Sequence, residues 1–233
     1  MHPPLHELLE QYTAQFHPVV PFDNEKDTLL PMDFTAANTE LTGPILADTA
    51  LFSAWVNRKI SEAGARYGIG GYAEHRTVYS ISAVFDGAAP GEEPRRLHLG
   101  IDIWGPAGTP VMAPLKGRIH SFAFNNRFGD YGATIILEHT FRGNTFLTLY
   151  GHLSLDSLEG LKEGNPVQKG QPFTTFGIPA ENGYWPPHLH FQVIRDIGSG
   201  RGDYPGVCRF SEREKYLANC PDPGLMIPFL KGK

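Results

Sequence analysis

Glycine and proline interrupt this chain so often that only short secondary-structure elements fit between them. The 233 residues include 26 glycines and 20 prolines, whereas the two together make up about 12% of an average protein. The intervening segments are rich in β-branched and aromatic side chains, which favour strands. Eight such segments occur with no long helical pattern between them, at residues 77–85, 97–103, 111–113, 117–124, 133–139, 145–150, 172–176 and 189–194. The sequence therefore predicts a mainly β fold, an antiparallel β sheet arranged as a sandwich or barrel.

The N-terminal third of the chain shows a different pattern. Apolar side chains recur at helical spacing over residues 5–12 and again over about 48–65, where Asp48 is a typical N-cap residue. Residues 68–72 (Gly-Ile-Gly-Gly-Tyr) are expected to form a loop. No long linker follows, so we expect this helical arm to pack on the β-rich part. The expected divisions are a helical and irregular arm, a β domain and an irregular C-terminal tail, at residues 1–75, 76–200 and 201–233.

Charge and hydropathy limit the partners that this chain can have. The formal net charge is −5, and no basic run is longer than Arg95-Arg96, so nucleic-acid binding is not expected. No apolar stretch approaches the roughly 18–20 residues that a membrane span needs. The first residues lack the basic flank and apolar core of a secretory signal. We therefore expect a cytoplasmic protein, with export by an unrecognised route as the alternative. Cys208 and Cys220 could form a disulfide or stay as thiols.

Two histidines lie two residues apart in the last predicted strand. Residues two apart on a strand share a face and lie about 6.6–6.8 Å apart. His188 and His190 can therefore address one metal ion, while Leu189 and Phe191 face the core. The spacing leaves open whether both histidines bind a metal, only one does, or both are polar residues on a solvated strand face.

A histidine and an aspartate lie four residues apart in an earlier strand segment. In an extended strand His98 and Asp102 would be about 13 Å apart, too far to share one ion. Gly100 between them permits a bend that brings them together. The alternative is a surface histidine and a turn-forming aspartate. Two histidines and one carboxylate together would leave a fourth position for water, as in catalytic zinc sites.

Three short motifs occur in an order that is similar to a known family. They are His-x-x-x-Asp at 98–102, Tyr-Gly-His-Leu-Ser at 150–154 and His-Leu-His-Phe at 188–191. Their wording and order resemble the lysostaphin-type zinc endopeptidase family, and the resemblance covers about residues 96–194. It implies an antiparallel β sheet that forms a central groove with zinc on its floor. One departure is Gln192, where a glutamate is common in that family.

The resemblance also implies a role for each motif residue. His98, Asp102 and His190 match the three metal ligands, which would hold one Zn²⁺ per chain. His152 and His188 match the two histidines that flank the metal-bound water. These two would share the work of general base and general acid, because histidine titrates in the useful pH range. The sequence does not assign the base to one of them.

The activity implied is that of a zinc metallopeptidase that cleaves Gly- or D-Ala-containing peptides, with a peptide or peptidoglycan-like substrate. An intracellular zinc hydrolase acting on a small amide is one alternative, motivated by the N-terminal sequence and the arm. A non-catalytic module that has kept the groove for binding is another. Partner proteins and oligomeric state are not indicated by the sequence.

Five further residues are candidates for the rim or wall of the groove. Tyr150 and Tyr184 could donate to an oxyanion, His139 and Trp185 could line the groove, and Asp130 could contact a substrate. Each also has an ordinary structural interpretation. Tyrosines and tryptophans on strands and loops often only pack, a histidine can end a strand, and an aspartate can stabilise a turn.

Overall fold

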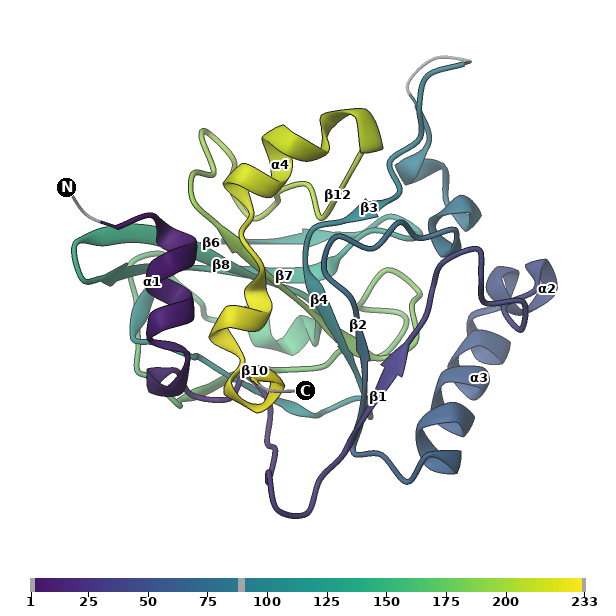
Figure 1. Cartoon of the computed structure of the whole chain (residues 1–233), viewed down its shortest axis with the longest axis horizontal. Helices are drawn as coiled ribbons and strands as arrows, with labels where there is room; N and C mark the ends of the chain where they lie inside the picture. Colours follow the sequence, from purple (N-terminus) through teal and green to yellow (C-terminus); the bar gives the residue numbers. More distant parts are fainter. Residues whose placement is uncertain (1–2, 88–90, 232–233) are drawn as a thin grey trace.

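A computed structural model, which describes residues 3–87 and 91–231, shows one large β sheet with helices at its edges (Figure 1). The sheet has eight strands in the order β1-β2-β4-β11-β8-β7-β6-β9, and two smaller sheets pair β10 with β5 and β12 with β3. The strands are β1 Leu29–Met32, β2 Tyr67–Gly70, β3 Leu97–His98, β4 Ile101–Trp104, β5 Pro110–Met112, β6 Gly117–Asn125, β7 Gly132–Phe141, β8 Asn144–Leu153, β9 Pro166–Val167, β10 Pro172–Thr175, β11 His188–Ile194 and β12 Val207–Cys208.

The helical elements are short apart from one. The α-helices are α1 Leu5–Gln11, α2 Gly43–Ala47, α3 Thr49–Glu62 and α4 Arg213–Asn219, and the 3-10 helices are η1 Thr13–Gln15, η2 Val78–Ile81, η3 Ala83–Phe85, η4 Leu155–Leu158, η5 Phe210–Glu212, η6 Pro223–Met226 and η7 Pro228–Leu230. The expected N-cap is present: a side-chain oxygen of Asp48 accepts hydrogen bonds from the backbone N–H groups of Ala50 (2.8 Å) and Leu51 (3.1 Å). Such a cap stabilises a helix by about 1 kcal/mol. Within the described residues, no helix combines the length and apolar character that crossing a membrane requires.

The mainly β fold and the N-terminal helices are confirmed, but four local predictions are wrong. Residues 77–85 form η2 and η3 instead of a strand, because the Ser82 side chain accepts a hydrogen bond from Val84 N–H and closes a tight turn. Residues 68–72 are not a loop, since most of them belong to β2. The sheet is mixed, because β1 and β2 run parallel. The tail after residue 200 is partly regular, with β12 and α4.

Both expected helices of the arm exist, and its strands also join the main sheet. β2 pairs with β4 in antiparallel register, which places Gly70 opposite Asp102. α3 buries Phe52 and Trp55 against Trp104 of β4, with Phe34 between them. The N-terminal segment therefore shares a core with the strand that carries Asp102.

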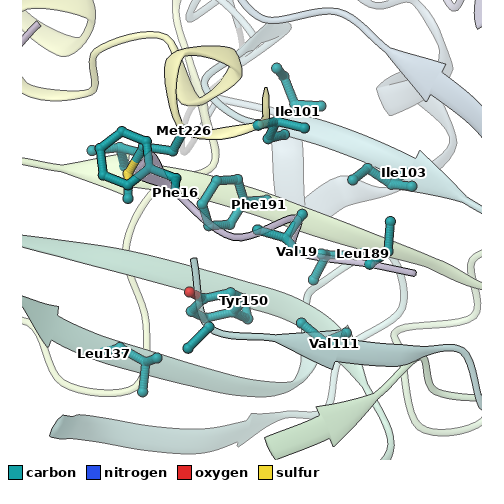
Figure 2. Close-up of a cluster of buried hydrophobic side chains, with 14 of the residues drawn as sticks. Phe16, Val19, Ile101, Ile103, Val111, Leu137, Tyr150, Leu189, Phe191 and Met226 are labelled. Atoms are coloured by element: carbon teal, nitrogen blue, oxygen red, sulfur yellow. The ribbon is translucent and has the colours of Figure 1, made fainter. Parts of the chain in front are cut away.

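The central strand β11 separates an apolar core from a polar site. Its odd-numbered side chains, including Leu189 and Phe191, lie in the largest hydrophobic cluster, and Figure 2 shows them with Ile101 and Ile103 of β4 and with Tyr150. Its even-numbered side chains point to the opposite face, because side chains alternate along a strand. The prediction that Leu189 and Phe191 face the core is confirmed, and the histidines of β11 gather on the other side of the sheet.

Candidate metal centre

Three side chains of the predicted ligand set converge on one point. His190 in β11 is paired across the strands with Asp102 in β4, and its Nδ1 lies 3.1 Å from Asp102 Oδ1. His98 at the end of β3 completes the group: its Nε2 is 3.0 Å from His190 Nδ1 and 3.3 Å from Asp102 Oδ1. All three residues are buried, and together they could hold a metal ion.

Gly100 supplies the bend that the sequence analysis required. It separates β3 from β4, so His98 and Asp102 reach the same point although they are four residues apart. A Cβ atom at Gly100 would lie 2.5 Å from Cε1 of His190. Real Cβ atoms do not approach a ring this closely, so the histidine of β11 can pack here only against a glycine.

The tautomers of four histidines follow from carbonyl oxygens that hold one nitrogen of each ring. A carbonyl oxygen only accepts hydrogen bonds, so the ring nitrogen next to it must carry the proton. The four donors and acceptors are His98 Nδ1 to Gly71 O (2.9 Å), His152 Nδ1 to Asn182 O (2.8 Å), His188 Nδ1 to Pro186 O (2.7 Å) and His190 Nε2 to the side-chain Oε1 of Gln192 (3.0 Å). The second nitrogen of each neutral ring is therefore left with a lone pair.

This arrangement fits a metal ion. His98 Nε2, His190 Nδ1 and Asp102 Oδ1 point at one another and lie 3.0–3.3 Å apart. Ligands at 2.0–2.1 Å around a tetrahedral zinc would be about 3.3–3.4 Å apart. Three mutually repelling acceptors at this spacing are what a bound cation would stabilise.

The two remaining histidines lie beside the triad. The ring of His188 stacks on Trp104, with centroids 3.9 Å apart, and its Nε2 is 4.0 Å from Asp102 Oδ1. The ring of His152 lies 4.0 Å from the ring of His188, centroid to centroid. His152 has a positive φ of 63°, which breaks the strand alternation that would otherwise turn it toward the core with Tyr150. This backbone conformation costs of order 1–3 kcal/mol and is common at functional sites.

Burial sets the charge of these histidines. It lowers the pKa of His188 to about 4 and the pKa of His152 well below its usual value, with further lowering of the latter by His188 and His190. It also lowers the pKa of His98 to about 4, with help from the charge of Arg76. Burial would raise the pKa of Asp102, but its interactions with His98 and Arg76 outweigh burial and lower that pKa well below its usual value. Near pH 7 these rings are therefore neutral and the carboxyl is ionised.

Several residues of the site were missed by the sequence analysis. Arg76 binds the second oxygen of Asp102, and Tyr131 places its hydroxyl 3.4 Å from Nε2 of His190. Gly151 leaves room for that tyrosine, because a Cβ there would lie 2.5 Å from the ring. Asn182 is fully buried and holds His152 through its backbone carbonyl. Gly129, Gly132 and Gly151 indicate close packing in this region. No feature of the sequence indicates a role for Arg76.

A cavity of about 320 Å³ opens beside the triad. Asp102, His152, His188 and His190 line it, together with aromatic walls from η2, η3 and the loop before β11; these walls include Tyr79, Phe85 and Trp185. The five predicted site residues thus lie together: four line the cavity, and His98 contacts His190, with Nε2 3.0 Å from Nδ1.

The five further candidates divide between wall and core. Trp185 and Asp130 line the cavity. Tyr150 is buried in the hydrophobic core on the opposite face, and His139 is buried between Lys116 O and Thr148 Oγ1. Tyr184 is exposed, with its ring 5.9 Å from that of Phe128. The packing interpretation therefore describes Tyr150 and His139.

A buried triad of two histidines and one aspartate, with two more neutral histidines beside a cavity, is the arrangement expected of the catalytic site of a metal-dependent hydrolase. The comparison with known families agrees. The model of peptidase family M23 matches residues 96–201, so this part of the chain is similar to that family, as the three motifs indicated. The match contains all five predicted site residues and excludes Arg76.

The alignments with individual relatives cover only part of those proteins. The chain is 32% identical over 147 residues to the L-Ala–D-Glu endopeptidase of Bacillus subtilis, which covers 60% of this chain and 42% of that protein. It is 39% identical over 98 residues to the DD-carboxypeptidase/endopeptidase Mpg of Neisseria meningitidis, covering 42% of this chain and 20% of that protein. The chain thus spans less than half the length of these relatives.

Among solved structures, the catalytic domain of lysostaphin from Staphylococcus simulans is similar to this chain. It is 27% identical, and the alignment covers 77% of this chain and 98% of that domain with a TM-score of 0.42.

Proposed function

We propose that this protein is a zinc-dependent peptidase that holds one zinc ion per chain between His98, Asp102 and His190. The observation that carries the proposal is the buried cluster of His98 Nε2, His190 Nδ1 and Asp102 Oδ1, which lie 3.0–3.3 Å from one another. A zinc ion bound by these residues would supply Lewis acidity, which would polarise a scissile carbonyl and lower the pKa of bound water to about 7. Two histidines and one carboxylate leave a coordination position for water or substrate.

His152 and His188 would move the proton during hydrolysis. Their Nδ1 atoms donate to backbone carbonyls, so their Nε2 atoms are the ones free to accept. Both rings are neutral near pH 7 because burial lowers their pKa values. One ring can therefore take a proton from the attacking water and deliver it to the leaving amine. Since the two rings lie 4.0 Å apart, only one of them can be charged at a time without strong repulsion.

The substrate proposed is a peptide, in particular a peptidoglycan-like peptide containing Gly or D-Ala. Support comes from the similar proteins of Bacillus subtilis and Neisseria meningitidis, which are endopeptidases or carboxypeptidases. The cavity wall also includes two acidic residues, Asp130 and Asp203, and two basic ones, Arg95 and Arg127. A substrate that carries both an amine and a carboxylate would complement this wall. The cytoplasmic location stays a prediction, which fractionation of the native cells would test.

Metal analysis and a peptide digest test the proposal together. We expect about one zinc per purified chain, removal of the zinc by chelator with loss of hydrolysis, and recovery when zinc is returned. The digest should use glycyl and D-alanyl peptides and purified peptidoglycan fragments, with cleavage read by mass spectrometry. A chain that neither contains zinc nor takes it up on titration would contradict the proposal.

A further inference from the structure

Arg76 is a buried cation in direct contact with the carboxylate of the metal triad. Its side chain is 1% exposed, and its Nη1 donates to Oδ2 of Asp102. Its Nε donates to Glu74 Oε2 at 2.6 Å, and Nη1 also lies 3.1 Å from the hydroxyl of Tyr79. This arginine precedes the segment that the family model matches, which begins at residue 96.

The N-terminal segment is shaped to hold this guanidinium. Its carbon lies 5.2 Å from the ring centre of Phe34 and 5.8 Å from that of Tyr79, so two aromatic faces stabilise the charge. A Cβ atom at Gly70 would lie 2.5 Å from Arg76 Nη2. Because β2 places Gly70 directly opposite Asp102, the absence of a side chain there gives the guanidinium its space next to the carboxylate.

The two oxygens of Asp102 therefore face different partners. Oδ1 lies within 3.3 Å of His98 Nε2 and His190 Nδ1, whereas Oδ2 is bound by Arg76. A carboxylate with no such partner can rotate or offer both oxygens to a metal. Groups that hold a ligand in this way typically change metal affinity 10–100-fold when they are removed.

We propose that Arg76 is a positioning residue that restricts Asp102 to single-oxygen ligation of the metal through Oδ1. This inference rests on the proposed metal site and adds a residue from the N-terminal segment to it. A guanidinium suits the task because its donors form a rigid fork that can bind Asp102 and Glu74 at once.

The test compares metal binding in the full-length protein and three variants. Arg76→Met removes the charge at similar length, and Arg76→Lys keeps the charge without the fork. Arg96→Met is the matched control, because Arg96 is a neighbouring arginine that pairs with Asp86 at 3.1 Å and with backbone carbonyls. Zinc affinity is measured by competition with a chromogenic chelator. Replacement of zinc by Co²⁺ adds a spectrum whose visible intensity reports the coordination number.

We expect zinc affinity to fall 10–100-fold in Arg76→Met and less in Arg76→Lys, with no change in Arg96→Met. The Co²⁺ spectrum of Arg76→Met should weaken per bound ion, as expected when a second carboxylate oxygen raises the coordination number. If the ion pair only stabilised the fold, its removal would lower the unfolding temperature but leave zinc affinity and the Co²⁺ spectrum unchanged. Unchanged affinity and spectrum in folded Arg76→Met would overturn the inference.

A second variant covers the case in which Arg76→Met does not fold. Gly70→Ala keeps the arginine in the sequence but puts a methyl group 2.5 Å from its Nη2, so it should displace the guanidinium and weaken zinc binding in the same direction. Gly43→Ala is its control, because a Cβ there would meet nothing within 4 Å. If Gly70→Ala binds zinc as tightly as the wild type, the inference fails. If the wild type itself binds no zinc, the proposed function fails instead, so the two failures are distinguishable.

Discussion

Two groups of buried histidines differ in how their ring nitrogens are used. His139 in β7 has both nitrogens occupied, with Nδ1 3.0 Å from Lys116 O and Nε2 2.7 Å from Thr148 Oγ1. At the metal centre a carbonyl oxygen holds only one nitrogen of each ring, and the other nitrogens face the triad or the cavity. Yet burial lowers the pKa of His139 to about 4, the same value as for His98 and His188.

A lowered histidine pKa therefore does not identify a functional site by itself. Burial is the largest cause of the shift in both places. The metal centre is set apart by its geometry, because two ring nitrogens and a carboxylate oxygen converge there within 3.0–3.3 Å of one another, an arrangement that a bound cation would stabilise. Variants in both groups of histidines and in their hydrogen-bond partners test this distinction.

The largest effect is expected from His190→Ala. This substitution removes the central lone pair of the triad, so zinc should fall from about one per chain toward zero and hydrolysis should be lost with it. Atomic absorption after gel filtration measures the zinc. His139→Ala is the control and should keep its zinc, since that ring lies outside the triad. Full zinc in His190→Ala would show that the ligand assignment is wrong.

The next effect separates proton transfer from metal binding. His188→Ala and His152→Ala should retain zinc but lose about 10²–10⁴-fold in kcat, the usual contribution of a general acid or base. The retained zinc is the internal control, because it shows that the triad is intact. Near-normal kcat in both variants would remove these histidines from the reaction.

A smaller effect is expected at Gln192. Its Oε1 accepts from His190 Nε2, and its own Nε2 donates to Pro205 O at 3.2 Å. Gln192→Leu removes the nearer acceptor of His190 Nε2 and leaves only the Tyr131 hydroxyl at 3.4 Å, so zinc affinity should fall about 10–100-fold. Gln192→Glu preserves the acceptor and should retain tight binding. Equal affinity of the leucine and glutamate variants would show that this hydrogen bond does not orient the ligand.

The smallest effect concerns stability and pH. Because the folded pKa of His139 is about 4 and an unfolded histidine has about 6.5, the unfolded chain binds more protons between these values. Stability should therefore be full above about pH 6.5 and fall as the pH drops toward 4, by up to about 1.4 kcal/mol per pH unit for this one histidine. Urea unfolding of the metal-free protein at pH 7, 6 and 5 measures the slope. His139→Gln should have a shallower slope, and an identical slope would contradict the expectation.

Much of the site could be predicted because its chemistry is local in sequence. His188 and His190 share a face through strand periodicity, and Gly100 marked the bend that joins His98 to Asp102. The position of His152 follows from a left-handed backbone at a non-glycine residue, which no pattern in the sequence announces. Its role could be expected only from the family resemblance.

The fold was less predictable in the N-terminal third. Residues 67–70 carry two glycines and resemble a loop, yet β2 forms because β4 offers a neighbouring edge for pairing. Residues 77–85 have the composition of a strand, but they pack Tyr79 and Phe85 against Trp185 as 3-10 turns. Both outcomes depend on tertiary partners distant in sequence, which override local propensity. Arg76 was unpredictable for the same reason.

The pairing of β2 with β4 also bears on how the protein can be divided for expression. A fragment starting at residue 96, where the family match begins, would lack β1 and β2 and leave β4 as an open edge strand. Ile103 and Trp104, now 0% and 3% exposed, would lose much of their cover. Unpaired apolar edges promote association between chains. Such a fragment should therefore aggregate. A longer fragment that starts at residue 29 and so keeps β1 and β2 should remain dispersed.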